Sequence, residues 1–486
     1  MENAGGSGIL YSDLASMQEA RELVKRALAA QKAYAEYNQE KVDRIIAAMA
    51  DAGYENARRL AAMAVEESGI GRVEDKVVKN QFASRNVYEA IKDMRTAGII
   101  NEDRAAGIIE IADPMGVVVG LIPTTNPTST IIFKAMIALK SRNAIVFSPH
   151  PRSIKCSIET ARVMEEAAVS AGAPRNLVNC LTMCTREATD ELMRHPDVAV
   201  ILATGGSAMV KAAYSSGKPA YGVGPGNVPA FVERSADIPM AVHNILTSKT
   251  FDNGTVCASE QAVVTEEVIA GQVEAEFKRQ GAYFVNDSER PLLEKTVMQP
   301  NGGVNPKVVG QSPEVIAKMA GIKIPEGTRV IVARLSEVGR GSPLSAEKLC
   351  PVLGFYVEKD WHRACERCIE LLNIGGLGHS LVIHSNNDEV IREFGLRKPV
   401  NRILVNTPSS QGAIGYTTGL QPSLTLGCGT KGNNITSDNV GPQHLMNVKR
   451  LAYGRGIGRP AGVSGNMGFA YKRDEIAKAV REYLKA

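Results

Sequence analysis

The sequence predicts an α/β fold built on parallel, doubly wound sheets. Between about residues 12 and 93, apolar residues recur at three- and four-residue steps, a period typical of amphipathic helices. Further along, short and continuously apolar runs alternate with helical segments, as where "NAIVFSP" precedes "KCSIETARVMEEAAVSAG". Strands that are apolar on both faces and separated by helices predict a parallel sheet covered on both sides.

The first alternation is expected from about residue 117 to residue 233. Its strands are predicted at "GVVVGL", "NAIVFSP", "LVNCLT", "VAVILATGG" and "VPAFVE". Just before it, the segment "GIIEIADPMGVVVGLIP" is β-rich but broken at Pro114, Met115 and Gly116. Such a break favours a hairpin or a pair of strands.

A second alternation begins near Ala236, so a boundary is placed at roughly 233–237. It opens with the helix "MAVHNILTSKT" and continues through strands at "EQAVVTE", "RVIVARL", "SLVIHS" and "RILVNTP", with a helix at "WHRACERCIELLN". The last sixty residues are rich in Gly and Asn and are expected to form loops and a closing helix, "RDEIAKAVREYLKA".

Composition excludes several classes of function. With 486 residues, 44% of them hydrophobic and 22% charged, the chain is an ordinary globular protein of two or three packed units. A net charge of +4, with basic and acidic residues interspersed, gives no footprint for nucleic acid. The longest apolar runs are half the length that crosses a bilayer, and "MENAGGSGILYSD" resembles no targeting peptide. Eight cysteines without a disulfide framework predict reduced thiols and a cytoplasmic protein.

Two glycine-rich stretches could approach a phosphate. In "LATGGSAMVKAA", Gly205, Gly206 and Ser207 lie between a buried strand and a helix, where free N–H groups and the helix dipole favour an anion. An ordinary N-cap turn is an equally common explanation. The stretch "YGVGPGN" lacks the full dinucleotide fingerprint and is typical of a loop.

Asn126 lies in "IPTTNPTST", at the carboxyl end of a predicted strand, where ligands bind in such sheets. Its amide could donate to an oxyanion, although an Asx turn before proline is the commoner role.

The cysteines differ in context. Cys365 and Cys368 form a C-x-x-C within a helical pattern and have no second pair nearby, so a zinc site is not expected. Cys257 follows the turn "DNG" and precedes small residues that leave it open to approach. Spacing alone still favours a structural thiol over a nucleophile.

Taken together, the motifs resemble the aldehyde dehydrogenase superfamily, in particular its coenzyme-A-acylating branch. The matching segments occur in the right order from about residue 15 to about residue 450. They are "PTTNPTS", "FSPHPRS", "ATGGSAMVKAAYSSGKPAYGVGPGNVP", "FDNGTVCASEQ", "EKLCPVL", "GLGHS", "NTPSSQG" and "LTLGCGT". The resemblance implies a Rossmann-type cofactor domain, a second α/β catalytic domain and a small β-hairpin arm used for oligomerisation.

The resemblance also implies the site residues. Cys257 is the nucleophile, and Asn126 with the Cys257 backbone N–H forms the oxyanion hole. His379 is a candidate acid or base, with a structural loop histidine equally common. The residues implied to contact NAD or NADP are Thr124, Pro149, His150, Arg152, Gly205, Gly206, Ser207, Gly224 and Glu347. Those implied to contact substrate are Thr125, Val256, Ala258 and Lys431, and no metal is implied.

The second half-reaction follows from one position. Hydrolysing relatives carry a glutamate about 34 residues before the cysteine, where this chain has Val223. The implied product is therefore an acyl-coenzyme A, formed reversibly from an aldehyde. Lys431 replaces a tryptophan of several relatives, which leaves sulfoacetaldehyde and succinate semialdehyde open beside acetaldehyde and propionaldehyde. Rival hypotheses are a hydrolytic dehydrogenase and a non-catalytic assembly homologue.

The expected domains are residues 1–234 for NAD(P) binding, with the arm around 105–116, then 235–430 for catalysis and 431–486 for C-terminal loops and a helix. The resemblance implies a homodimer or homotetramer that acts on small molecules, with no nucleic-acid or membrane partner. It leaves enclosure in a bacterial microcompartment open.

Overall fold

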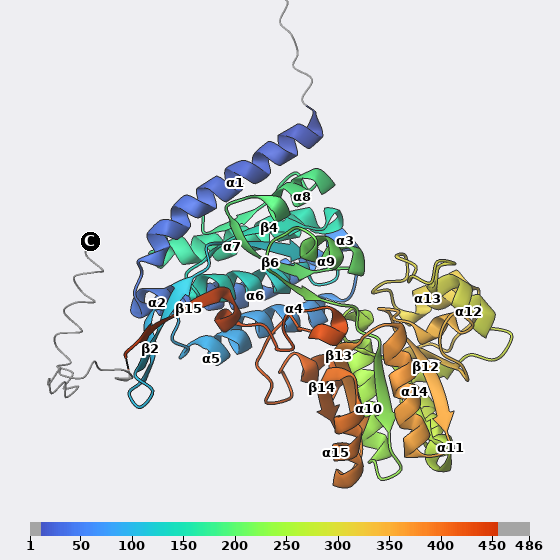
Figure 1. Ribbon diagram of the computed structural model, residues 1–486. Helices are drawn as coiled ribbons and strands as arrows, with labels where there is room; N and C mark the ends of the chain where they lie inside the picture. The colour runs from blue at the N-terminus through green and yellow to red at the C-terminus, as the bar shows by residue number, and fades with distance from the viewer. Residues whose placement is uncertain (1–10, 455–486) are drawn as a thin grey trace, which may run out of the picture.

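The computed structural model describes residues 11–454 and contains two parallel sheets and a small antiparallel one (Figure 1). Six helical segments come first, as the three- and four-residue apolar period predicts. They are α1 (Ser12–Ala35), α2 (Gln39–Glu55), α3 (Ala57–Ser68), α4 (Val73–Gln81), a π-helical turn (Phe82–Asn86) and α5 (Val87–Ile91). The predicted α/β class with parallel sheets is confirmed.

The five-stranded sheet has the order β5-β4-β3-β6-β7, with every neighbouring pair parallel. Its strands are β3 (Val117–Ile122), β4 (Ala144–Pro149), β5 (Val178–Cys180), β6 (Val198–Thr204) and β7 (Ala220–Val223). The helices that connect them are α6 (Pro127–Lys140), α7 (Ile154–Ser170), α8 (Arg186–Arg194) and α9 (Ser207–Tyr214). All residues of β3 and α6 are buried, because helices cover both faces of this sheet.

The seven-stranded sheet has the order β10-β11-β12-β9-β8-β13-β14 and is also parallel. Its strands are β8 (Val228–Val232), β9 (Glu260–Glu266), β10 (Ala282–Phe284), β11 (Val330–Arg334), β12 (Val352–Glu358), β13 (Gly378–His384) and β14 (Val400–Val405). The helices of this part are α10 (Ile238–Thr250), α11 (Glu267–Arg279), α12 (Arg290–Val297), α13 (Pro313–Ala320), α14 (Trp361–Ile374), α15 (Asp388–Arg397) and α16 (Ser409–Ala413).

One strand was grouped with the wrong sheet. The sequence pattern put "VPAFVE" at the end of the first alternation, but β8 pairs with β9 and β13 in the seven-stranded sheet. A strand buried on both faces has the same apolar pattern in either sheet, so the pattern could not reveal its partners. The division of the chain at residues 234 and 430 stays a prediction.

The antiparallel sheet contains β1 (Gly98–Asp103), β2 (Ile108–Pro114) and β15 (Met446–Ala452), with β2 in the middle. It forms an arm that lies away from the seven-stranded sheet in Figure 1. The segment around 105–116 was expected to pair across the break at Pro114, Met115 and Gly116. It does not, because both edges of β3 are already occupied by β4 and β6. The chain passes from one sheet to another at this break.

The C-terminal part also differs from its prediction. Residues 446–452 form strand β15, where loops were expected. Its pairing with β2 is supported by ion pairs from Lys449 to Asp113 and from Arg450 to Glu110, at 3.1 Å each. Most of β15 is exposed, so the sequence lacks the apolar alternation that signals a strand. The predicted closing helix lies outside the described residues. Within residues 11–454, no helix is long and apolar enough to span a membrane.

Asn143 fastens the arm to the five-stranded sheet. Its Oδ1 accepts from the backbone N–H groups of Met115 and Gly116, at 2.8 and 2.9 Å, and its Nδ2 donates to the Leu445 carbonyl at 2.7 Å. The side chain is fully buried, so no water can replace these bonds.

We expect Asn143→Ala to lower the free energy of unfolding by about 2–4 kcal/mol, since it removes the partner of one buried and two half-buried backbone groups. Urea denaturation followed by circular dichroism would measure the change. Asn101, an exposed residue of β1, supplies the control: Asn101→Ala should shift stability by less than about 0.5 kcal/mol. Equal effects of the two substitutions would contradict this account.

Candidate active site

The main candidate cavity has a volume of about 690 Å³ and lies at the carboxyl edge of the five-stranded sheet. Segments that follow β3, β4 and β6 line it, together with the loop that precedes β9 and part of the segment before β12. Ten residues that the sequence singled out line this cavity: Thr124, Thr125, Asn126, Pro149, His150, Gly205, Gly206, Gly224, Cys257 and Glu347.

Five of the remaining predicted residues do not line the cavity: Arg152, Val256, Ala258, His379 and Lys431. Arg152 is exposed and donates to the Ser68 carbonyl at 2.9 Å, while Ser207 is the first residue of α9. Val256 and Ala258 are buried in the core beside Cys257. Lys431 is exposed on a short turn over Thr430–Gly432. The last of the set, His379, lies behind Cys257 and contacts it directly.

The turn that displays Cys257 is built from three consecutive residues with positive φ: Asp252 (49°), Asn253 (52°) and Gly254 (74°). Asn and Asp tolerate this region better than other side chains, and glycine has no Cβ to clash. The motif "DNG" is therefore explained by its backbone. In addition, the Asn253 amide donates to the Gly310 carbonyl at 2.9 Å, which holds the turn in place.

Cys257 and His379 form a neutral pair. The Cys257 Sγ lies 3.3 Å from the His379 Nε2, and the His379 Nδ1 lies 3.0 Å from the Ser380 hydroxyl. Burial, followed by the carboxylate of Glu347, raises the pKa of Cys257 to about 12. Burial also lowers the pKa of His379 to about 3. At neutral pH the thiol keeps its proton, and the uncharged imidazole can accept it.

Asn126 does not cap its helix. It is the residue before α6, but its side chain makes no capping bond, and so the expected Asx turn is absent. The Asn126 Oδ1 accepts from the Lys79 ammonium at 2.6 Å, and its Nδ2 donates to the Thr125 hydroxyl at 3.0 Å. The amide is thus available to the cavity that Cys257 also lines.

Glu347 is a half-buried carboxylate on the cavity wall. Its Oε1 accepts from the Gly226 N–H at 3.0 Å, and burial raises its pKa to about 7. Gly226 also packs against the nucleophile loop, since a Cβ there would lie 1.9 Å from the Cys257 carbonyl oxygen. Only glycine fits this approach, which gives part of "YGVGPGN" a purpose that its sequence pattern did not reveal.

The region expected to hold a dinucleotide contains unused donors. The hydroxyls of Thr124 and Thr204 are buried, line the cavity and have no partner in residues 11–454. Gly206, immediately before α9, has open space where a Cβ would lie. Unsatisfied hydroxyls beside a helix N-terminus fit a polar, phosphate-bearing ligand.

Several residues that line the cavity were not predicted from the sequence. Four of them come from the β5–α8 connection and α8: Cys184, Thr185, Arg186 and Thr189. Thr204, at the end of β6, was also missed although it directly precedes the two glycines. An unremarkable connection between a strand and a helix carries no local signal of a binding wall, whereas the position of Thr204 could have been inferred from the glycines.

The two cysteines of the C-x-x-C motif lie in the core and not in the cavity. Cys365 and Cys368 are buried on α14, and all eight cysteines of the chain are free thiols. Within the described part of the chain, no three His, Cys, Asp or Glu residues are placed to hold a metal ion.

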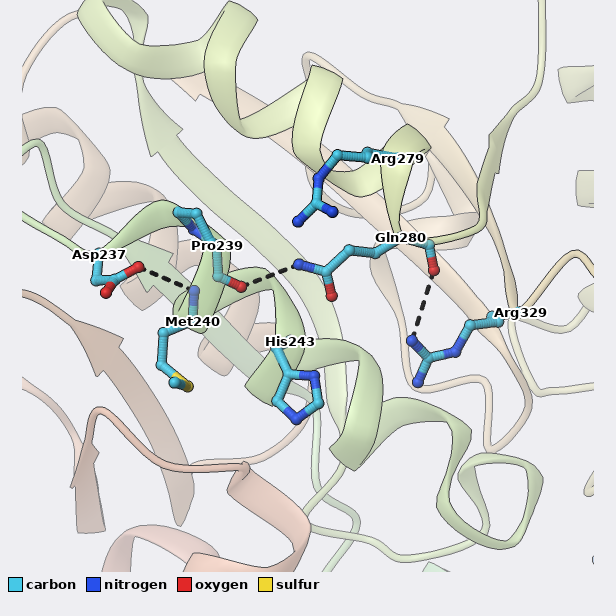
Figure 2. Close-up of a pocket in the computed structure, with 7 residues that line it drawn as sticks. All are labelled: Asp237, Pro239, Met240, His243, Arg279, Gln280 and Arg329. Carbon is cyan, nitrogen blue, oxygen red and sulfur yellow. Dashed lines mark hydrogen bonds between the residues drawn. The ribbon is translucent and has the colours of Figure 1, made fainter.

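A second cavity, of about 540 Å³, lies near the start of α10 and the end of α11 (Figure 2). Its polar groups largely bond to one another: Asp237 accepts from the Met240 N–H, and Gln280 joins the Pro239 carbonyl to Arg329. None of the predicted site residues lines it. We therefore place the candidate active site in the cavity that contains Cys257.

Comparison with known proteins shows which family this chain is similar to. The profile described as "Aldehyde dehydrogenase family" matches residues 3–301. The bifunctional aldehyde-alcohol dehydrogenase AdhE of Escherichia coli K12 is 46% identical over 442 residues, which cover 90% of this chain and 50% of that protein. The chain thus spans about half the length of the first curated relatives it matches.

Two solved structures match this chain over nearly their whole length. An acetylating aldehyde dehydrogenase from Geobacillus thermoglucosidasius is 53% identical with a TM-score of 0.91, over 94% of this chain and 100% of that one. A propionaldehyde dehydrogenase from Rhodopseudomonas palustris, with bound CoA and an acylated cysteine, is 27% identical with a TM-score of 0.81. That match covers 89% of this chain and 97% of the other.

The neutral state of Cys257 has a measurable consequence. Because the thiolate is the reactive form and the pKa of Cys257 lies near 12, alkylation by iodoacetamide should rise about tenfold per pH unit between pH 7 and pH 10. Mass spectrometry of the labelled Cys257 peptide would follow the rate, with Cys257→Ala giving the background from other thiols. A plateau beginning near pH 7 would show a preformed thiolate instead.

Proposed function

The chain belongs to the aldehyde dehydrogenase family, and we propose that it is an acylating member, which converts an aldehyde and coenzyme A reversibly into an acyl-coenzyme A while reducing NAD or NADP. This proposal rests on a cysteine that contacts a base, and on a valine at the position where hydrolysing relatives carry a glutamate. Cys257 contacts His379, whereas Val223 occupies the position from which hydrolysing relatives activate water.

The first step is attack of the Cys257 sulfur on the aldehyde carbon. A new C–S bond forms, the carbonyl π electrons move to oxygen, and the thiol proton passes to His379 Nε2. A neutral thiol and a neutral imidazole start the step, so proton transfer accompanies attack. The alkoxide lies where the Asn126 amide and the Cys257 N–H can donate to it.

The NAD(P) site is proposed along the carboxyl edge of the five-stranded sheet. Gly206 leaves the backbone before α9 open to the pyrophosphate, and the hydroxyls of Thr124 and Thr204 supply unused donors. Glu347 is proposed to accept from the nicotinamide ribose. The bound nicotinamide supplies a hydride acceptor, which leaves an acyl thioester on Cys257.

The second half-reaction is thiol exchange. Val223 is buried on the cavity wall and cannot remove a proton from water. We propose that His379 first releases to solvent the proton it took from Cys257. The coenzyme A thiol then gives its proton to His379 and attacks the thioester carbon, and as the bond to Cys257 breaks, the departing sulfur takes that proton from His379. A thioester replaces a thioester, so the free energy is conserved and the reaction runs in both directions. The R. palustris enzyme, with CoA and an acylated cysteine, supports this assignment.

One observation favours a second candidate, hydrolysis to a free acid. Among residues 11–454, Glu347 is the only carboxylate that lines the cavity, and its pKa of about 7 suits a general base. Its Oε1 is engaged by the Gly226 N–H, which favours a binding role instead. The non-catalytic hypothesis has no comparable support, because it leaves the contact between Cys257 and His379 without a function.

We propose a short, uncharged aldehyde such as acetaldehyde or propionaldehyde. Within the described part of the chain, Arg186 is the only arginine or lysine that lines the cavity, and it is the first residue of α8. The predicted role of Lys431 in selecting an anionic aldehyde is not favoured, because that side chain is exposed and lies outside the lining.

Assembly and location are proposals of the same kind. The arm formed by β1, β2 and β15 is proposed to join copies into a homodimer or homotetramer, since no strand within residues 11–454 pairs with the outer edge of β1 or of β15. Eight free thiols support a reducing cytoplasm, and a microcompartment location would be compatible with it.

The decisive test is NADH formation with and without coenzyme A. We expect sustained turnover of acetaldehyde only when coenzyme A is present, and at most one NADH per active site without it. Cys257→Ala should lose at least about 10³-fold in rate while its circular dichroism spectrum is unchanged. Many turnovers without any thiol would establish hydrolysis, and an active Cys257→Ala protein would refute the nucleophile.

A further inference from the structure

The buried ammonium of Lys79 contacts Asn126, the proposed oxyanion donor. Lys79 lies on a helix of the N-terminal group and not on either parallel sheet. Lys79 lies on α4, is 4% exposed, and directs its Nζ toward the turn that holds the nucleophile. It donates to the Asp252 carboxylate at 2.5 Å, to the Asn126 Oδ1 at 2.6 Å and to the Thr255 hydroxyl at 3.1 Å. An ammonium has three hydrogens, so each one has an acceptor.

This contact decides which way the Asn126 amide faces. A lysine can only donate, so the atom that meets Lys79 must be the amide oxygen. The Nδ2 group therefore points the other way, where one of its hydrogens meets the Thr125 hydroxyl. Its second hydrogen has no acceptor within residues 11–454 and is available to an alkoxide in the cavity.

The charge balance around the contact is positive. Lys76 and Lys79 share one carboxylate, that of Asp252, at 2.8 and 2.5 Å. Asp75 lies 3.7 Å from the exposed Arg72 and also acts on Lys79. These three cations and two carboxylates leave one positive charge in excess, and Lys79 is the cation that contacts the amide. A cation on the amide oxygen withdraws electrons from the N–H bonds and makes them stronger donors.

We propose that Lys79 is a positioning residue for the reaction: it holds the Asn126 amide with its N–H group toward the substrate oxygen and polarises that group. This inference rests on the proposed function, because it assigns a task to a side chain that touches no reacting atom. Lys79 acts through Asn126, so its effect exists only while Asn126 is present.

Lys76 provides a matched control. It is equally buried, on the same helix, and its Nζ donates to the same Asp252 oxygen. Its other acceptor is the Thr125 carbonyl at 2.7 Å, and it makes no bond to the Asn126 amide. Loss of either lysine should weaken the buried ion cluster to a similar degree, but only loss of Lys79 frees the amide.

The experiment is a double-mutant cycle on acetaldehyde oxidation with coenzyme A and NAD. Asn126→Ala should lower kcat at least about 100-fold, as removal of an oxyanion donor does. Lys79→Met should lower kcat about tenfold with little change in the KM for aldehyde. In the Asn126→Ala background, Lys79→Met should add less than about a twofold loss. Lys76→Met should lower the melting temperature as much as Lys79→Met but leave kcat within about twofold.

Alkylation of Cys257 by iodoacetamide separates positioning from damage, because that displacement needs no oxyanion hole. Its rate should be unchanged in Lys79→Met. Lys79→Gln, run through the same cycle, keeps the test available if the methionine variant does not fold. Additive losses in the cycle, or equal kcat losses in the Lys76 and Lys79 variants, overturn the proposal. A wild-type protein that forms no NADH from aldehyde and coenzyme A overturns the proposed function itself.

Discussion

The buried carboxylate of Asp252 joins the parts of the molecule that must meet for chemistry to occur. It belongs to the loop before β9, yet it accepts from Lys76 and Lys79 of α4 and from the Arg72 N–H. The residue keeps a left-handed backbone to do so, with φ of 49°. Positive φ is costly outside glycine, so the surrounding bonds must hold the turn in place. Cys257 is displayed five residues later by a loop that the N-terminal helices thus restrain.

This arrangement explains why two separate sheets supply one site. The carboxyl edge of the five-stranded sheet offers Asn126 and the glycines before α9, while the loop before β9 offers Cys257 and β13 offers His379. Neither sheet contains enough of the machinery alone. Gly226 lies in the segment that connects the two sheets, and it packs against the Cys257 backbone. This contact brings the residues from the two sheets together.

The sequence predicted the parallel α/β architecture because apolar strands and amphipathic helices leave periodic patterns. It also led to Cys257, Asn126 and Glu347, since each lies in a motif whose order resembles a known family. Lys79 was not predicted, because "VEDKVVKN" has the residue pattern of an ordinary charged helix. The residues that Lys79 contacts, Asn126 and Asp252, are 47 and 173 residues away in the sequence. The sheet to which β8 belongs was misjudged for a related reason: pairing is a long-range property that local periodicity does not record.

Because Cys257 and His379 are both uncharged, the nucleophile is less exposed to oxidation. Peroxide and other oxidants attack thiolates and react slowly with thiols. A nucleophile that stays protonated until an aldehyde arrives presents little of the oxidisable form to the surrounding solution. Many cysteine enzymes keep a standing thiolate and are correspondingly open to oxidative inactivation. In this protein, the surroundings that raise the pKa of the sulfur also protect it from oxidation between turnovers.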